Sequence, residues 1–467
     1  MIKYRMLQGA RILSVPSQEH VDRTRPTLVA HSRWSTPMSV YNNCICNEYM
    51  ALRCRHLVDR AGSITREWEK YASQTERFYA DQLIPCSMAS VVNSYKGVKK
   101  QRYMRAWAYI GKYGYERGKH DRVQMFVKNE RFYKDHLGVK PPRAIQFRTP
   151  EFNLCFMRYV KVMEEWYYPR LTYGCVSGTR VVAKGLNWRE RAGLLMEKAC
   201  SFKKPLFVMS DYTAFDSTIS VRHLRTTHRK YRKVFGKGLD SILASQINNK
   251  GRTRSGIKYR VRGTRMSGDA DTALGNTIVN LDAIYAWLMM QGIQKYDMLV
   301  DGDDSVIIVE DGTQLNGALF ENLGLVAKIQ TTTELHQVEF CQSRLVLVPE
   351  PLLVRNPFKV MSGITVCKHQ LKGRWMDWLA GLGECEMACN PGVPILSVVA
   401  RELRQLGKRP ILDEDMMRRM EGMSVEDRDI TPVARMTFYK SWGVPPGVQV
   451  MIERQICNSI CFVKNAE

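Results

Sequence analysis

The stretch Met298-Leu-Val-Asp-Gly-Asp-Asp-Ser-Val-Ile-Ile-Val309 places two apolar runs on either side of the acidic centre Asp301-Gly302-Asp303-Asp304. Apolar runs of this length, rich in β-branched residues and joined by a polar centre that contains glycine, predict a β-hairpin. The hairpin would carry three carboxylates on one tight turn. Because like charges held this close repel each other, we expect a cation to bind beside them.

A second acidic segment precedes the first in the chain. The apolar run Pro205-Leu-Phe-Val-Met-Ser-Asp211 ends in an acid, and Asp216 follows five residues later. Side chains alternate along a strand, so Asp216 reaches the same pocket only if the chain bends after Asp211. We expect Asp211 and Asp303 to bridge two Mg²⁺ ions about 3.5–4 Å apart, the arrangement for in-line nucleotidyl transfer. Asp216 would face the incoming sugar.

A turn and a predicted helix lie between the two acidic segments. Ser267-Gly268 predicts a flexible turn, and Asp269 is a candidate N-cap for the helix that follows. Thr272 and Asn276 are four residues apart and therefore share one helix face. This face presents two short hydrogen-bonding side chains, which suit the binding of a ribose hydroxyl beside Asp216.

These three segments, in this order, resemble motifs A, B and C of viral RNA-dependent RNA polymerases. The matching patterns are Asp-x4-Asp at 211–216, Ser-Gly-x3-Thr-x3-Asn at 267–276 and Gly-Asp-Asp at 302–304. The fuller sequences Arg-Met-Ser-Gly-Asp and Thr-Ala-Leu-Gly-Asn are most similar to tombusvirus-like polymerases of positive-strand RNA viruses. The resemblance implies an α+β right-hand fold with fingers, a palm built on an antiparallel sheet, and a mostly helical thumb.

Three further segments resemble polymerase motifs F, D and E. Motif F is matched by 126–130 and 140–148, motif D by 324–328 and motif E by 339–343. The resemblance implies that Lys128, Arg143 and Arg148 present fixed cations to the triphosphate. A solvated charged face is the alternative for these cations. Lys328 is the candidate general acid for the pyrophosphate leaving group, with a surface lysine as its alternative.

Several of these residues keep two interpretations. Asp304 is placed among the catalytic and metal-binding residues, although it could instead only shape the local field, and Asp301 could be structural. Asn276 could be a buried polar group that ties the helix to a neighbouring strand. Ser267 and Gly268 could simply permit a turn, whereas the family implies a mobile loop beneath the template, with Ser267 near the nucleotide and Gly268 near RNA. Mn²⁺ is an alternative ion to Mg²⁺.

The chain is strongly basic. Its 70 Lys and Arg residues against 46 Asp and Glu give a net charge of +24, and such a surplus attracts polyanions. A cluster between Tyr95 and Tyr115 interleaves aromatic side chains with basic ones, and we expect it to line an RNA channel through phosphate contacts. A soluble basic surface is the alternative. The candidate RNA-binding residues in this cluster are Lys99, Lys100, Arg102 and Arg105.

At 467 residues the length suggests about three domains. We predict an N-terminal arm at 1–90, fingers at 91–200 and 225–262, a palm at 201–224 and 263–350, and a thumb at 351–467. Amphipathic patterns predict thumb helices within 394–406 and 413–423. Cys44, Cys46, Cys54 and His56 have an atypical zinc spacing, so buried thiols are favoured.

The longest apolar stretch, 278–293, is interrupted by Asn280 and Asp282 and is too short to span a bilayer. The family resemblance implies template and product RNA, nucleoside triphosphates and other viral replication proteins as partners. It also implies peripheral membrane association in the host cytoplasm, at membrane-associated replication complexes. Two other functions stay open: a reverse transcriptase, which shares the palm chemistry, and a non-catalytic RNA-binding replication factor.

Overall fold

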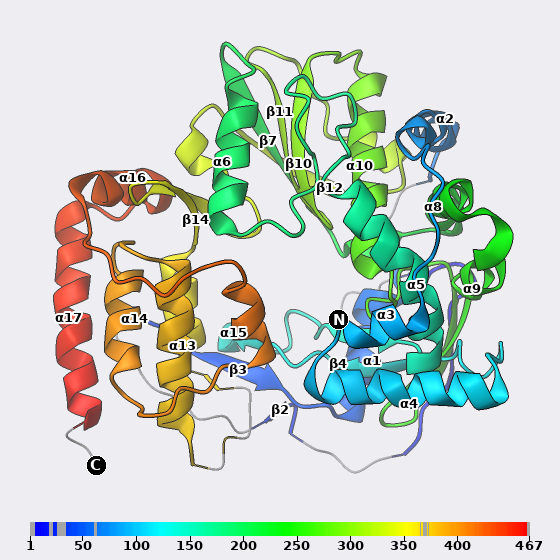
Figure 1. Cartoon of the computed structure of the whole chain (residues 1–467), viewed down its shortest axis with the longest axis horizontal. Coiled ribbons are helices and arrows are strands. Elements are labelled where there is room, and N and C mark those ends of the chain that lie inside the picture. Colours follow the sequence, from blue (N-terminus) through cyan, green and yellow to red (C-terminus); the bar gives the residue numbers. More distant parts are fainter. Residues whose placement is uncertain are drawn as a thin grey trace.

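The computed structural model describes residues 5–17, 22–25, 34–59, 63–364, 366–367, 371 and 373–464, with side chains described up to residue 457. Within these residues the chain combines helices with antiparallel and mixed sheets, in agreement with the predicted α+β class. Figure 1 shows a central sheet between helices at the top, a mixed sheet with helices at the lower right, and a helical C-terminal part at the lower left.

The central sheet has the strand order β10-β11-β7-β12 and is antiparallel throughout. The predicted hairpin is confirmed, because β10 (Tyr296–Asp301) and β11 (Asp304–Glu310) pair with Asp301 opposite Asp304. Gly302 in the turn has a φ of +68°, which glycine adopts without a steric cost from a Cβ. The other two strands are β7 (Pro205–Tyr212) and β12 (Ala327–Thr332).

Two helices cover opposite faces of this sheet (Figure 1). On one face, Val208 and Ile307 pack in the core that contains α10 (Thr272–Met290). On the other face, Phe207 and Ile308 pack in the core that contains α6 (Trp188–Ala199). Since side chains alternate along a strand, Asp211 lies on the α6 face, on the same side as Phe207.

The helix α10 begins later than the sequence predicted. Asp271 is its N-terminal flanking residue and makes no side-chain cap, so Asp269 is not the N-cap. Asp269 instead forms a buried ion pair of 3.0 Å with Arg148, at which both side chains are 1% exposed. A buried carboxylate beside a guanidinium is better satisfied by this charged partner than by a helix terminus, which explains the difference.

A second, five-stranded sheet has the order β1-β9-β8-β4-β6. It is antiparallel except for the parallel pair of β4 with β8. Helices from the N-terminal half and from the segment between β7 and β8 lie beside it (Figure 1). The strands are β1 (Arg11–Ser14), β4 (Val123–Val127), β6 (Ala144–Phe147), β8 (Asn248–Thr253) and β9 (Lys258–Arg262). These helices are α1 (Ile45–Ala51), α3 (Met88–Asn93), α4 (Gly97–Tyr113), α5 (Pro150–Tyr167), α8 (Val221–Phe235) and α9 (Asp240–Ser245). The helix α2 (Arg66–Gln74) packs instead against α10, beside the central sheet (Figure 1).

The C-terminal part packs around its own hydrophobic core, which also includes side chains of the hairpin β13 (Ser343–Leu347) and β14 (Pro351–Arg355). Helices occur in both predicted ranges, as α14 (Leu396–Arg404) and α15 (Glu414–Arg419). No helix in the described part of the chain is long and apolar enough to cross a membrane. The remaining C-terminal helices are α12 (Pro357–Ile364), α13 (Trp375–Cys389), α16 (Pro432–Trp442) and α17 (Pro446–Lys464).

A small sheet connects the N-terminal segment to the C-terminal helices, and its strands lie between the two lower parts in Figure 1. Its strands are β2 (Thr24–Arg25), β3 (Met38–Tyr41) and β5 (Arg131–Tyr133). The Thr36 N–H donates to Ser362 Oγ of α12 at 2.9 Å, and Trp34 Nε1 donates to Gln455 Oε1 of α17 at 3.0 Å. Two of the predicted domain limits fall inside structural elements. The limit between 224 and 225 falls inside α8, and the limit between 350 and 351 falls inside the β13–β14 hairpin. The domain limits remain predictions.

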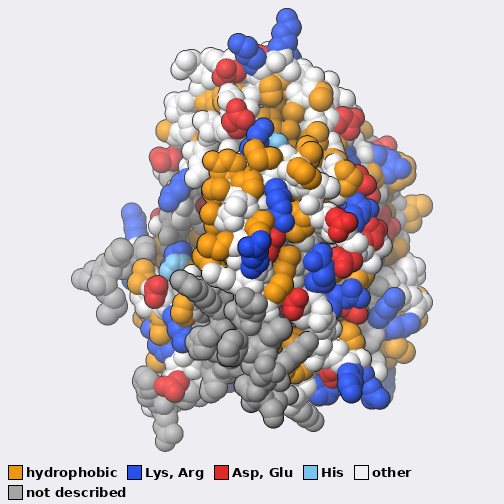
Figure 2. Space-filling view, turned by 90° about the vertical axis from the view of Figure 1, so that its left-hand side faces the viewer, with side chains coloured by type: hydrophobic (Ala, Val, Ile, Leu, Met, Phe, Trp, Pro, Cys, Tyr) orange, Lys and Arg blue, Asp and Glu red, His pale blue; other side chains and the backbone are white. Residues whose placement is uncertain are grey.

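The outer face of the C-terminal helices carries a broad apolar area interrupted by Lys and Arg side chains (Figure 2). Five large hydrophobic side chains of α16 and α17 are more than one third exposed. Contiguous apolar area on a folded surface often marks a place of contact with another molecule. These side chains are Val433, Met436, Tyr439, Val448 and Met451.

A buried ion pair joins α8 to α10. Lys230 Nζ lies 2.6 Å from Asp282 Oδ2, and both side chains are fully buried. Asp282 also accepts hydrogen bonds from Thr75 Oγ1 at 2.6 Å and from Tyr173 OH at 3.0 Å. The four groups satisfy one another, so removing one leaves a buried charge or donor without a partner.

We therefore predict that Asp282→Ala lowers the free energy of unfolding by about 3–5 kcal/mol, because it strands the Lys230 charge in the core. Glu310→Ala is the control, since it breaks a solvent-exposed pair with Lys295, and it should lower the free energy of unfolding far less than Asp282→Ala. Urea denaturation of both variants measures the difference. Equal, small losses would contradict the prediction.

Candidate active site

The strand register brings the predicted acids together. Ser305 of β11 pairs with Ser210 of β7, so the next position along each strand sets Asp304 beside Asp211. On the other side of β7, Lys328 of β12 is the direct partner of Asp211. Cross-strand neighbours point to the same face, and the Asp211, Asp304 and Lys328 side chains are all exposed there. Asp303 is exposed in the turn itself.

The acids at this sheet edge repel one another. Asp304 is open to solvent, yet the surrounding protein removes much of its hydration. This desolvation, followed by the negative charges of Asp303, Asp301 and Asp211, raises the pKa of Asp304 to about 7. The positive charge of Lys184 opposes these effects without offsetting them, so a cation bound here would relieve the repulsion.

Asp301 has a different environment, which answers the question that the sequence left open. It is paired with Lys184 and with Arg191, whose Nη2 lies 2.6 Å from Asp301 Oδ2. Burial acts to raise the pKa of Asp301, but the two cations outweigh it, and the pKa lies below its usual value. Asp301 therefore anchors the hairpin to α6 and the segment before it.

The described residues contain no group of three or more His, Cys, Asp and Glu side chains close enough together to hold a metal ion. The thiols predicted to be buried differ in exposure, because Cys44 is buried, Cys54 is half-buried and Cys46 is exposed. At the sheet edge, Asp211, Asp303 and Asp304 still offer only oxygen donors, which is the chemistry that Mg²⁺ and Mn²⁺ prefer. Their unbalanced charge and exposure fit a divalent cation, with Asp301 withdrawn from the set by its ion pairs.

Two polar residues of α10 bind the backbone of the Gly302 turn, and sequence reasoning did not identify them. Asn280 Nδ2 donates to the Gly302 carbonyl at 3.0 Å, and the Gly302 N–H donates to Thr277 Oγ1 at 3.2 Å. Asn280 Oδ1 also accepts from Tyr212 OH of β7 at 2.9 Å. The only signal in the sequence is that polar residues interrupt an apolar helix at these positions.

The predicted sugar-selecting pair is in contact. After β7 the chain turns through Ala214, which has a φ of +53° and leads into the short helix α7 (Phe215–Thr218). This bend brings Asp216 to Asn276, whose Nδ2 donates to Asp216 Oδ1 at 2.8 Å. Burial raises the pKa of Asp216, and the hydrogen bond from Asn276 acts against this effect. The predicted bend after Asp211 is therefore confirmed.

The other motif B residues bind the backbone. Thr272 Oγ1 donates to the carbonyls of Met266 and Asp269, both at 2.9 Å, so its hydroxyl closes the preceding loop. Ser267 Oγ accepts from the Gln146 N–H of β6 at 3.1 Å. A Cβ on Gly268 would lie 2.6 Å from Phe147 Cβ, so glycine is needed for this close approach to β6. None of these contacts involves Asp216 or Asn276.

The motif F cations divide into two groups. Lys128 and Arg143 both face Glu130, at 3.5 and 3.6 Å, and their side chains are 38% and 53% exposed. These weak, exposed pairs leave both cations available to a ligand. Arg148 is 1% exposed and bonded to Asp269, Asp121 and Asn249. This placement does not match a triphosphate contact, because its guanidinium is already used inside the protein.

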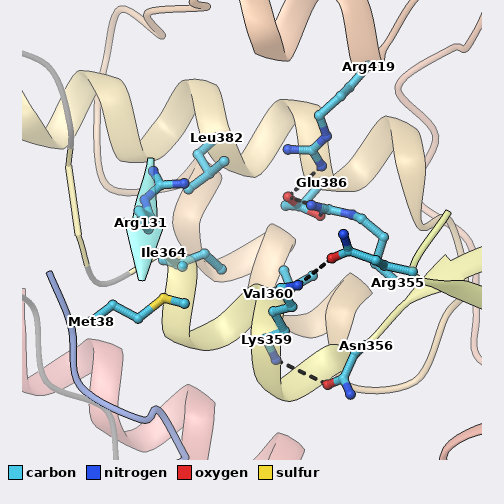
Figure 3. A pocket seen from close by; sticks show the side chains of 12 residues that line it. Met38, Arg131, Arg355, Asn356, Lys359, Val360, Ile364, Leu382, Glu386 and Arg419 are labelled. Carbon is cyan, nitrogen blue, oxygen red and sulfur yellow. Dashed lines mark hydrogen bonds and ion pairs between the residues drawn. The ribbon is translucent and has the colours of Figure 1, made fainter. Parts of the chain in front are cut away.

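A basic pocket of about 200 Å³ lies beside the motif E turn, between β5, β14 and the C-terminal helices (Figure 3). Arg355 and Arg419 both bind Glu386 at 2.7 Å. Burial acts to raise the pKa of Glu386, but these two cations lower it to about 2. Arg131 and Lys359 add further positive charge to the lining. The lining of the pocket therefore carries more positive than negative charge, which suits the binding of phosphate groups.

The basic cluster of α4 lies along the lower edge of the molecule in Figure 1, away from the central sheet. Lys99 Nζ lies 4.2 Å from the centre of the Tyr95 ring. Burial lowers the pKa of Lys99, and nearby Arg102 and Arg418 lower it further against Glu414. The start of α4 thus faces α15 across a cationic region. The other predicted members of the cluster are Lys100, Arg102 and Arg105, all at least partly exposed.

The sequence matches known proteins over most of its length. The family model described as viral RNA dependent RNA polymerase matches residues 47–460. The RNA-directed RNA polymerase of Groundnut rosette virus (strain MC1) is 31% identical over 399 residues, which are 80% of this chain and 46% of that protein. The polymerase of Cucumber necrosis virus is 29% identical over 447 residues, or 89% of this chain and 54% of that protein.

A third relative, the RNA-directed RNA polymerase of Oat chlorotic stunt virus (isolate United Kingdom), is 29% identical over 404 residues, 79% of this chain and 53% of that protein. The chain spans about half the length of these relatives. The family implies the right-hand polymerase fold. Since the family model covers nearly the whole chain, including the acidic hairpin and the Asp216–Asn276 pair, the chain belongs to the viral RNA-dependent RNA polymerase family.

Proposed function

We propose that this chain carries the catalytic activity of an RNA-directed RNA polymerase that copies a positive-strand viral RNA genome by two-metal nucleotidyl transfer. One observation carries the proposal. The register of β7 with its neighbours sets Asp211 beside Asp304 and opposite Lys328, and a single bend of the chain then brings Asp216 to Asn276. Asp211 and Asp216, five residues apart on one segment, thus contribute one acid to the metal site and one member of the polar pair for the sugar.

Asp211 and Asp303 would hold two Mg²⁺ ions, with Asp304 as a further ligand and Mn²⁺ as a substitute ion. When bound, the ions lower the pKa of the attacking hydroxyl and offset charge on the phosphates. The 3′-hydroxyl oxygen of the growing strand bonds to the α-phosphorus of the nucleotide, and the bond to pyrophosphate breaks. Lys328, exposed opposite Asp211, is positioned to give a proton to the leaving group.

The remaining site residues bind and orient the nucleotide. Arg143 and Lys128 are the exposed cations that would steer the triphosphate. Asp216 and Asn276 would hydrogen-bond the ribose. Arg148, Ser267 and Thr272 would act indirectly, since their polar groups bind the protein itself. Base pairing with the template, rather than protein side chains, would select the base.

The right-hand architecture assigns a role to each part of the fold. The central sheet with α10 would be the palm, the five-stranded sheet with its helices the fingers, and α12–α17 the thumb. RNA would pass over cationic surfaces, namely the pocket beside motif E and the start of α4, which includes Lys99 and Arg102. Gly268 would act by keeping its loop close to β6.

The partners and location are proposed from family membership and charge. They are template and product RNA, nucleoside triphosphates and other viral replication proteins. Peripheral association with membrane-bound replication complexes in the host cytoplasm is likewise a proposal. A reverse transcriptase would exclude the ribose 2′-hydroxyl, whereas the pair found here, Asp216 with Asn276, offers hydrogen bonds to it.

We predict that Asp303→Ala abolishes RNA synthesis, by at least on the order of 10²–10³-fold, because it removes a metal-binding carboxylate at the reacting phosphate. RNA affinity should remain, since the basic surfaces are unchanged. Primer-independent synthesis on short defined templates with Mg²⁺, together with a filter-binding assay, measures both. Asp311→Ala is the matched control, because Asp311 directly follows β11 at the end far from the turn. Normal synthesis by Asp303→Ala would contradict the metal-binding role of Asp303. A wild-type protein that makes no RNA, together with intact viral replication by Asp303→Ala, would favour the non-catalytic replication factor.

We also predict that Asn276→Ala lowers the preference for NTPs over dNTPs about tenfold, the effect of losing one hydrogen bond of about 1.4 kcal/mol. Single-nucleotide incorporation on an RNA template, with kcat/KM for each sugar, measures this preference. Thr272→Val should leave it near the wild-type value, because the Thr272 hydroxyl binds loop carbonyls. A wild-type protein that prefers dNTPs would instead identify a reverse transcriptase.

A further inference from the structure

A buried arginine lies behind the sugar-selecting pair. Arg265 is 1% exposed, and its Nε donates to Asn276 Oδ1 at 3.2 Å. Its backbone N–H donates to the carbonyl oxygen of Asp216 at 2.8 Å. One residue therefore holds both members of the pair, through its side chain and through its backbone.

The contact with Arg265 decides which way the Asn276 amide faces. An asparagine can present either its oxygen or its NH₂ group to a given neighbour. An arginine N–H can only donate, so Oδ1 must face Arg265 and Nδ2 must face Asp216. The observed bond from Nδ2 to Asp216 Oδ1, at 2.8 Å, is the result. This bond leaves the second carboxylate oxygen of Asp216 to accept from a ligand hydroxyl.

The position of Arg265 is itself fixed. Its Nη1 lies 2.7 Å from Asp271 Oδ2, and Asp271 also accepts from Tyr231 OH at 3.1 Å and from Gln246 Nε2 at 2.8 Å. A Cβ on Gly275 would lie only 2.2 Å from Arg265 Nη2. The guanidinium therefore fits only because residue 275 of α10 is glycine, and it cannot move without losing a bond to Asp271 or Asn276.

We propose that Arg265 is a positioning residue for sugar selection, which holds the Asn276 amide in the orientation that lets Asp216 and Asn276 bind the ribose 2′-hydroxyl. This inference rests on the proposed polymerase function. Arg265 does not contact the nucleotide and acts through Asn276. Gly275 is the second part of the device, because it makes room for the guanidinium.

Two variants test the proposal by different routes. Arg265→Lys keeps a positive charge for Asp271 but removes the Nε donor to Asn276. Gly275→Ala keeps every polar group and displaces the guanidinium. Each should lower the NTP over dNTP ratio of kcat/KM about five- to tenfold, through a loss for NTPs with little change for dNTPs. A merely structural role would reduce both substrates together.

A double variant tests whether Arg265 acts through Asn276. In the Asn276→Ala background, Arg265→Lys should cause no further fall in the ratio, because the amide that it positions is already absent. Arg222→Lys is the matched control, since Arg222 of α8 bonds to Glu69 and to the carbonyls of Ile64 and Thr65 rather than to Asp216 or Asn276, and it should keep the wild-type ratio. Circular dichroism and melting temperatures confirm that the variants fold.

The proposal is overturned if Arg265→Lys and Gly275→Ala both keep the wild-type ratio, or if Arg265→Lys lowers the ratio further in the Asn276→Ala background. If Asn276→Ala itself leaves the ratio unchanged while Asp303→Ala abolishes synthesis, the sugar contact fails and the role of Arg265 with it. If the wild-type protein itself extends no RNA, the polymerase function fails instead. These results are distinguishable in the same incorporation assay.

Discussion

The site depends on the hydrogen-bond register between β7 and its two neighbours. Ser210 opposite Ser305 places Asp211 beside Asp304, and Asp211 opposite Lys328 places a cation on the same face. A slip of one residue would send these side chains to the opposite face, against α10. The same slip would move Phe207 and Ile308 out of the core that contains α6. The burial of these hydrophobic side chains therefore fixes the strand register, and this register in turn sets the positions of the acids.

The helix α10 adds a second constraint from the other side of the sheet. It is mostly apolar and buried, so each polar side chain on it must find a partner. Asn276 binds Asp216 and Arg265, while Thr277 and Asn280 bind the Gly302 turn. These bonds tie the sugar pair and the acidic turn to one rigid element. The spacing between the two halves of the site is thus set by the helix rather than by flexible loops.

The sequence allowed the local elements to be predicted, because their causes are local. Apolar runs around Gly302 indicated the hairpin, and the offset between Asp211 and Asp216 showed that both acids reach one pocket only if the chain bends between them. What the sequence could not indicate was which charged groups meet inside the fold. Asp301 is paired with Lys184 and Arg191, from a segment more than one hundred residues earlier in the printed sequence.

The same limit explains the residues whose roles changed. Arg148 matches a motif F position, yet Asp269 and Asn249, from later segments of the chain, occupy its guanidinium. Arg265 lies inside motif B, but its importance depends on Asp271, Gly275 and Asn276 meeting around it. A motif identifies such residues by position in the chain. Only the packed structure distinguishes a cation that faces a ligand from one that holds the protein together.

This distinction gives meaning to the net charge of +24. Buried pairs such as Arg148–Asp269, Arg265–Asp271 and Lys230–Asp282 are each neutral, so they contribute nothing to this surplus, which lies on other residues. Lys128 and Arg143, by contrast, remain exposed, and their ion-pair partner among the described residues is Glu130. Arg143 also acts to lower the pKa of Asp216. A site that combines mutually repelling carboxylates with exposed cations is best satisfied by a ligand that carries both signs of charge. A metal-bound polyphosphate is such a ligand, and neither a free cation nor a bare phosphate would balance the two halves of the site alone.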